Sequence, residues 1–164
     1  MKQPPQLSQA QARMAHGALT RDGFLGTDSR NLVEILQDDD GRVRRLGLSH
    51  ADLAAALQRL TDAALAHMGA PVVVDDRFEV HSVEAMGRMP CPFSHPGLFV
   101  KAEVHGRRLD TGETLVWTPL SVHLIGAHGF YQGRGSPYRL EPEHLAEFLG
   151  MGGGGEGDAL DLVS

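Results

Sequence analysis

Four side chains of this sequence belong to the types that bind transition metals best. The only cysteine, Cys91, lies between two prolines and four residues before His95, and His123 and His128 follow further along the chain. Cysteine sulfur and imidazole nitrogen are the commonest ligands of zinc in proteins. We therefore expect a metal site, most simply for zinc, that is built from one cysteine and three histidines.

The spacing within each pair limits how these ligands can be used. A proline-rich loop fixes Cys91 and His95 with little loss of entropy on folding. His123 and His128 fall on a predicted helix, where five residues advance by about 500°, so their rings start about 140° apart. Both reach one ion only if the last turn loosens before Gly129. A site with three protein ligands and a water is therefore favoured, and such open sites are typical of catalytic zinc.

Two other interpretations of the same residues stay open. Cysteine often behaves as a small buried apolar residue, and a histidine inside a fold is often satisfied by a backbone carbonyl. Cys91 could also be a nucleophile, with His95 or His123 as its base. A catalytic cysteine usually has a lowered pKa at a helix N-terminus or beside an oriented imidazole, and no helix pattern begins at Cys91.

Carboxylates near the predicted strands could assist a metal-bound water. Glu84 and Glu103 are the candidates for a general base in metal-assisted hydrolysis, although charged residues on the open face of a sheet are ordinary. His81 and His105 lie in the same strands. If these strands pair in a suitable register, the two histidines are neighbours and form an alternative metal pair.

A glycine-rich loop near the C-terminal end could bind an anion. Arg134 offers a bidentate fork, Ser136 a hydroxyl, and glycine amides can form a nest for an anion. The spacing matches neither a P-loop nor a dinucleotide-binding fingerprint. The simpler interpretation is a tight loop in which Tyr131 and Tyr138 pack against the body of the protein.

The part of the chain before the predicted sheet contains two predicted helices. One helix is expected to begin near Asp28 or Ser29 and to end at Gly41, after an acidic run that we interpret as a solvated helix end. The clearest helix follows, because Ser49 and Asp52 have the spacing of a capping box ahead of an apolar stripe.

The middle of the chain predicts an antiparallel sheet, and helices follow it. Alternating residues indicate strands near 72–74, 78–83, 98–105 and 115–117, with the Cys91 segment as a long loop between two of them. Thr118 and Pro119 predict the start of a buried helix that ends at Gly129, and a last helix begins near Glu141. The fold class is therefore α+β: N-terminal helices, an antiparallel sheet of three to four strands, and C-terminal helices.

Composition and length limit the domain organisation and the classes of partner that are possible. We expect one domain over residues 13–150, a flexible N-terminal segment (1–12) and a flexible glycine-rich tail (151–164). The formal charge of −6 disfavours nucleic acid as a partner, since nucleic-acid binding needs clustered basic residues. No apolar run is long enough to cross a membrane, and no secretory signal is visible.

These features together predict a cytoplasmic protein that binds zinc and has a small molecule or a protein as its partner. A metal-dependent hydrolase is one form of this prediction, and the biochemical role and the oligomeric state stay open. A lone cysteine excludes an intramolecular disulfide, in keeping with a reducing compartment. The basic residues are nearly all arginine, which we interpret as genomic codon bias, typical of some bacteria. The alternative is a non-catalytic interaction or small-molecule-binding domain whose cysteine and histidines are structural.

Overall fold

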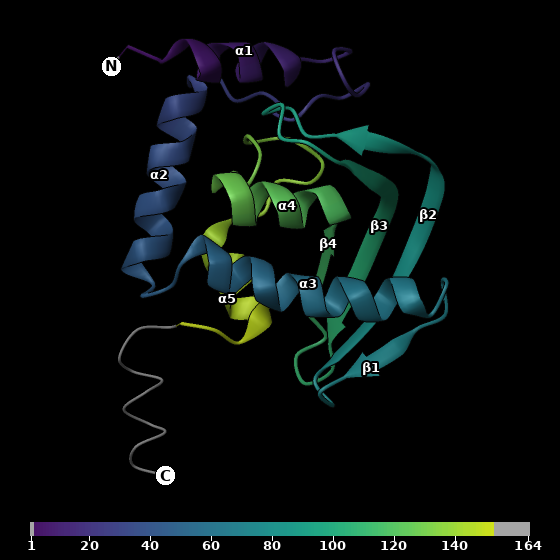
Figure 1. Ribbon diagram of the computed structural model, residues 1–164. Helices are drawn as coiled ribbons and strands as arrows, with labels where there is room; N and C mark the ends of the chain where they lie inside the picture. The colour runs from purple at the N-terminus through teal and green to yellow at the C-terminus, as the bar shows by residue number, and fades with distance from the viewer. Residues whose placement is uncertain (1, 153–164) are drawn as a thin grey trace.

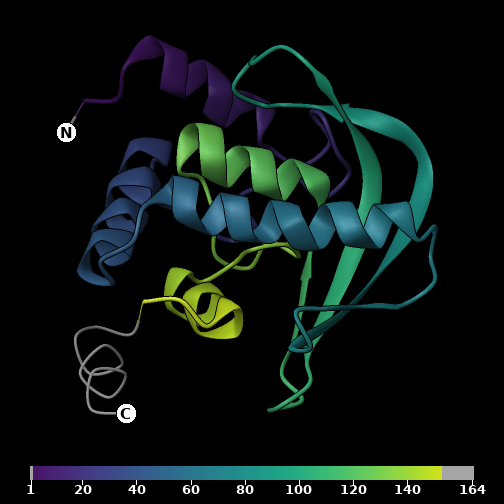
Figure 2. The ribbon, with the colours of Figure 1, turned by 60° about the horizontal axis from the view of Figure 1, so that its bottom comes forward.

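The computed structural model describes residues 2–152, and its elements confirm the predicted α+β class. The elements run in the order α1 (Pro5–Arg13), α2 (Leu32–Arg45), α3 (His50–Ala66), β1 (Val72–Val74), β2 (Phe78–Pro90), β3 (Leu98–Arg108), β4 (Thr114–Trp117), α4 (Pro119–His128) and α5 (Pro142–Leu149). Helices α3 and α4 lie side by side over one face of the sheet (Figures 1 and 2). The predicted glycine-rich tail lies outside the described residues, except for its first two.

The sheet has four antiparallel strands in the order β1-β2-β3-β4. The long β2–β3 pair runs from Phe78 opposite Arg108 to Pro90 opposite Leu98, with a shift of register between Glu84 and Arg88. Because β2 continues to Pro90, Cys91 follows directly after a strand. The connection between the two strands is therefore only residues 91–97, shorter than the sequence predicted.

Two groups of buried apolar side chains form the core. One lies between α3 and the sheet around Trp117, whose indole nitrogen donates to the Thr61 hydroxyl at 2.8 Å. The other lies between α1, α2 and α4 and includes Leu120, Leu124 and Cys91. Burial of these side chains holds α4 against the end of β2. No helix of residues 2–152 is long and apolar enough to cross a membrane.

The N-terminal segment forms a helix, where the sequence predicted a flexible stretch over residues 1–12. Helix α1 buries Ala10 against the body of the protein. The side-chain oxygens of Gln11 and Gln3 accept the backbone amides of Leu32 and Val33 at 3.0 and 2.9 Å. These two amides belong to the first turn of α2 and have no partner within that helix. Gln11 of α1 and Gln3 just before it thus pair with the free amides at the start of α2, and no local sequence pattern indicates this pairing.

Helix α2 differs from its predicted bounds at both ends. It begins at Leu32 behind the N-cap Asn31, which forms a capping box with Glu34, and it continues through Gly41 to Arg45. The acidic run lies inside the helix, and its middle residue, Asp39, is fully buried. The prediction of a solvated helix end was therefore wrong for Asp39.

A buried ion pair explains how Asp39 is tolerated. Both carboxylate oxygens accept from Arg139, at 2.5 and 2.9 Å, and one also accepts from Arg42 at 3.2 Å. Arg139 also binds Glu141, which Arg42 contacts at 2.9 Å. Charged groups removed from water must be paired and hydrogen-bonded. The network thus fixes α2 to the segment before α5.

This network predicts that the protein loses stability in acid. Hydrogen bonds from Arg139 lower the pKa of Glu141 to about 2, with a smaller contribution from Arg42. A folded-state pKa below the ordinary value of about 4.3 means that the stabilisation is complete above that value and is lost as the pH falls through the folded pKa. We expect the free energy of unfolding from urea titrations to fall between about pH 5 and pH 2.

The matched variant for this test is Glu141→Gln, which keeps the shape of the side chain but cannot titrate. Its unfolding free energy should depend less steeply on pH over the same interval than that of the wild type. Identical pH slopes for the two proteins would show that Glu141 is not one of the groups responsible.

Candidate metal centre

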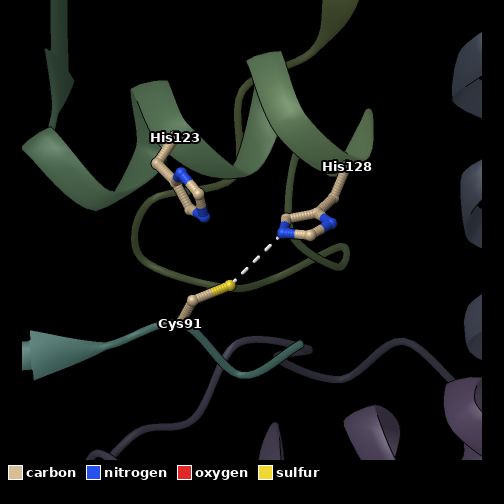
Figure 3. A group of neighbouring side chains, drawn as sticks. All are labelled: Cys91, His123 and His128. Carbon is tan, nitrogen blue, oxygen red and sulfur yellow. Dashed lines mark hydrogen bonds between the residues drawn. The ribbon is translucent and has the colours of Figure 1, made fainter. Parts of the chain in front are cut away.

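The structure brings Cys91 against helix α4. Cys91 projects from the end of β2, and His123 and His128 point from α4 toward it (Figure 3). The helix begins where predicted, because the Thr118 hydroxyl accepts the amide of Ser121, and it ends at Gly129 in the left-handed conformation. Strong caps at both ends set where α4 begins and ends, and both histidines lie between them.

Three ligand atoms converge at this place. The sulfur of Cys91 and one ring nitrogen each of His123 and His128 lie within 4.8 Å of one another, the only such group of three found in residues 2–152. The sulfur is 3.4 Å from Nε2 of His128. In tetrahedral zinc sites, ligand distances of 2.0–2.3 Å place neighbouring ligand atoms about 3.4–3.7 Å apart. Small side-chain rotations would therefore bring these atoms to ligand spacing.

The two histidines meet although the last turn of α4 stays helical. The amide of Gly129 donates to the carbonyl of Ile125 at 3.0 Å, an ordinary α-helical bond. The ring centroids of His123 and His128 are nevertheless 5.2 Å apart. The two rings thus approach each other without a loosened turn, and their binding to one ion stays a prediction.

His95 lies at the outer side of the site. Its Nδ1 is 3.1 Å from Nε2 of His123, and the two rings stack with their centroids 4.8 Å apart. His95 is exposed and does not belong to the group of three converging ligand atoms. Of the four predicted ligands, the structure thus brings three together and places the fourth beside them, with its ring also 5.5 Å from that of His128.

Two residues that hold the site were missed by sequence reasoning. The ring of Phe93 stacks on His128 with a centroid separation of 4.2 Å. The guanidinium of Arg13 donates to the carbonyl of Pro92 at 2.6 Å and so ties the loop to α1. The proximity of Phe93 to Cys91 in sequence was a usable signal, whereas nothing local indicates a partner as distant as Arg13.

The environment keeps the nitrogen ligands neutral. Burial, together with the charges of His123 and His95, lowers the pKa of His128 to about 4. Burial and the charge of His95 also lower the pKa of His123. Imidazole must be neutral to bind a metal, so both rings are in the binding form at neutral pH.

The thiol is not arranged as a free nucleophile. Burial raises the pKa of Cys91, and amide hydrogen bonds from Phe93 and His95 oppose this only in part. A nucleophilic cysteine needs a lowered pKa. A metal ion would supply the missing positive charge, because a coordinated thiol is deprotonated outright.

A groove reaches the site from the surface. It has a volume of about 520 Å³ and lies between α3 and α4, with His123 on its wall. Its other lining residues include Ala54, Gln58, Phe99, Val122 and Gly126. A small molecule in this groove would therefore lie against one of the candidate ligands.

The candidate carboxylates lie elsewhere. Both oxygens of Glu103 are engaged, one by the hydroxyl of Tyr138 at 2.5 Å and the other by His105 at 3.0 Å. Glu84 is exposed at the register shift in β2. No hydrogen bond among the described residues joins either carboxylate to the metal candidates, so their role as a general base stays a prediction.

The two histidines on the strands, His81 and His105, are neighbours, because β2 and β3 pair in a register that places them opposite each other. His81 lies opposite His105 in the β2–β3 pair, and their rings stack with a centroid separation of 4.9 Å. The described residues supply no third ligand atom within metal-binding reach of this pair.

The glycine-rich loop binds groups of the protein itself. The amide of Arg134 donates to the Asp28 carboxylate at 3.1 Å, and the Ser136 hydroxyl donates to the side chain of Gln132 at 2.6 Å. Tyr131 is buried, and its hydroxyl contacts His50 at 2.8 Å. The loop is packed as the simpler interpretation expected, and anion binding at Arg134 and Ser136 stays a prediction.

Comparisons with known proteins do not assign the site. Neither a family model, nor a curated protein, nor a solved structure matches this chain. The convergence of Cys91, His123 and His128 is therefore the strongest indication of function that the molecule offers.

Proposed function

We propose that this protein binds a divalent transition metal, zinc, through Cys91, His123 and His128. The observation that carries the proposal is the approach of a buried sulfur, from the connection after β2, and two half-buried imidazoles, from α4, to within 4.8 Å of one another. Sulfur and imidazole ligands favour zinc over calcium or magnesium, which prefer oxygen. A cytoplasmic location, where thiols stay reduced, suits a site that needs its cysteine free.

Three protein ligands leave one position of a tetrahedral ion unfilled. His95 contacts the candidate ligand His123 at 3.1 Å, and His123 also lines the groove between α3 and α4. Water in the open position would be activated by the metal, which makes metal-assisted hydrolysis of a small molecule the reaction class that we propose. If His95 instead supplies the fourth ligand, the ion has four protein ligands and its role is structural.

Metal content tests the proposal directly. We expect protein purified without an affinity tag or chelator to hold about one equivalent of zinc by elemental analysis. Cobalt substituted for zinc should give the charge-transfer absorption of a cobalt–thiolate bond, and Cys91→Ser should abolish this absorption. His123→Ala and His128→Ala should each weaken binding at least about 100-fold, because each removes a ligand.

Two further variants make the test specific. His81→Ala removes a histidine of the strand pair and should leave metal content unchanged. His95→Ala should keep the metal if the fourth position is open and should lower the affinity markedly if His95 closes it. Less than about a tenth of an equivalent in the wild type, with no uptake of added zinc, would exclude the proposed ligand set. The interaction-domain alternative would then hold.

A further inference from the structure

A second cleft has none of the candidate metal ligands in its lining. It has a volume of about 410 Å³ and is enclosed by residues 20–24, the outer parts of β2 and β3, and the start of α4. Sites for small molecules commonly measure roughly 300–1,000 Å³ and are mainly apolar with a few placed polar groups. Apolar side chains contribute much of the lining here, among them Phe24, Met89, Val100, Ala102 and Leu120.

Gln132 offers a buried hydrogen-bond donor to this cleft. The residue lines the cleft and is only 4% exposed. Its side-chain oxygen accepts the Ser136 hydroxyl at 2.6 Å, which fixes the amide group and leaves the nitrogen on the other side. No hydrogen bond from this nitrogen to another group of residues 2–152 is found. In this part of the chain, every side-chain nitrogen that is fully buried does have a hydrogen-bond partner, so this nitrogen is not fully buried. The nitrogen must therefore reach open space, and the cleft is the space that Gln132 lines.

The backbone holds Gln132 in an unfavourable conformation. Its φ of +69° lies in the left-handed region, which residues other than glycine seldom adopt. Arg139 donates to the carbonyl of Gln132 at 2.9 Å, and the amide of Gly133 donates to the carbonyl of Phe24 at the same distance. Conformations of this kind persist only where surrounding contacts maintain them, and they cluster at ligand sites.

The charged residues that line the cleft are either already hydrogen-bonded or exposed, so none of them is a buried donor for a ligand. Glu103 is already engaged by Tyr138 and His105. The remaining charged residues of the lining are exposed and balanced in sign: Arg21, Lys101, Asp22 and Glu84. Gln132 thus offers a neutral N–H donor within a mainly apolar lining.

We propose that this cleft binds a small uncharged molecule that has an apolar body and a carbonyl or amide oxygen, and that this oxygen accepts a hydrogen bond from Nε2 of Gln132. A hydrocarbon would leave the donor unpaired, which has a cost in free energy once water is displaced. An ammonium group cannot accept from the donor and would itself lose its hydration. The site uses none of the proposed metal ligands and does not depend on the metal.

Binding of two matched probes, hexanamide and hexylammonium at pH 7, tests the proposal by nuclear magnetic resonance of ¹⁵N-labelled protein. Hexanamide should give saturable shifts of the Gln132 side-chain amide and of the backbone amides of Gly23 and Ala102. Hexylammonium should bind at least about fivefold more weakly, since it offers no acceptor. Absence of saturable hexanamide shifts at these positions, or equal binding of the two probes, would overturn the proposal.

Variants assign the interaction to Gln132. Gln132→Met should weaken hexanamide binding about tenfold, as expected for loss of one buried hydrogen bond. Gln132→Glu replaces the donor by an acceptor and should reverse the preference toward hexylammonium, which provides a second test if the methionine variant folds poorly. Arg44→Met, at an exposed position of α2 outside the cleft lining, should leave hexanamide binding unchanged. Unchanged hexanamide affinity in both folded Gln132 variants would exclude the assigned contact.

Discussion

Replacing Arg139 by methionine should lower the free energy of unfolding by about 3–5 kcal/mol, because it leaves the charge of Asp39 buried without its main partner. The side chains of Arg139 and Asp39 are 6% and 1% exposed, so water cannot replace the lost hydrogen bonds. Arg42 remains at 3.2 Å from Asp39, but it contacts a single carboxylate oxygen. Urea denaturation followed by circular dichroism measures the change.

The appropriate control is an arginine of α2, the helix that carries Asp39, whose ion pair lies on the surface. Arg44 binds Asp40 while its side chain is 78% exposed, so Arg44→Met should change stability by less than about 0.5 kcal/mol. In the double variant Asp39→Leu/Arg139→Met, removing both charges should restore part of the lost stability. A loss below about 1 kcal/mol in Arg139→Met alone would show that Asp39 finds other compensation.

Gly26→Ala should also destabilise the protein strongly, by about 2–4 kcal/mol, since two separate costs add. Gly26 has a φ of +59°, in the left-handed region that penalises a side chain. A Cβ at this position would also lie 2.2 Å from the backbone nitrogen of Ser136 and 2.4 Å from the carbonyl carbon of Gly135. These are backbone atoms, so the loop 133–136 must move away as a unit.

A substitution at Gly47 measures the cost of the left-handed backbone conformation without the cost of steric overlap. The φ of Gly47 is +74°, but a Cβ there would meet nothing within 4 Å. Gly47→Ala should therefore cost only the conformational part, about 1–2 kcal/mol. Thermal and urea denaturation of both variants give the comparison. Equal losses in the two proteins would mean that the contact between Gly26 and loop 133–136 contributes no measurable stability.

Elements with strong local signals could be predicted from the sequence. Thr118 and Pro119 at the start of α4, and Gly129 at its end, determine the helix by interactions within a few residues. The capping box of Ser49 and Asp52 did the same for α3. Alternation along β2 and β3 placed the strands, because a half-buried strand must alternate whatever else the fold contains.

Elements that depend on distant partners could not be predicted in this way. Helix α1 is ordered in part by contacts with the first turn of α2, and the burial of Asp39 depends on Arg139, far along the chain. The polarity of the local sequence therefore suggested a flexible N-terminal segment and a solvated end of the helix at the acidic run. No short-range pattern distinguishes an exposed carboxylate from one that is paired across the fold.

The candidate site was predictable in its residue types but not in its arrangement. Cysteine and histidine identify their own chemistry, so the four candidates could be chosen from the sequence. Whether Cys91 would meet α4, and whether His95 would stay outside the converging group, depended on how far β2 extends and on the anchoring of its loop by Arg13. Gln132 had no signal, since its importance comes from an unpartnered nitrogen and a backbone angle.

The positions of Cys91 in the connection between β2 and β3, and of His123 and His128 on α4, have a consequence for folding. An ion shared by these residues would cross-link the end of the β2–β3 hairpin to α4 and close a long loop of the chain. Metal affinity and folding stability would then be linked quantities, with about 2.7 kcal/mol added to the native state when free metal exceeds its dissociation constant 100-fold. The melting temperature of the protein would in that case report the concentration of free metal around it.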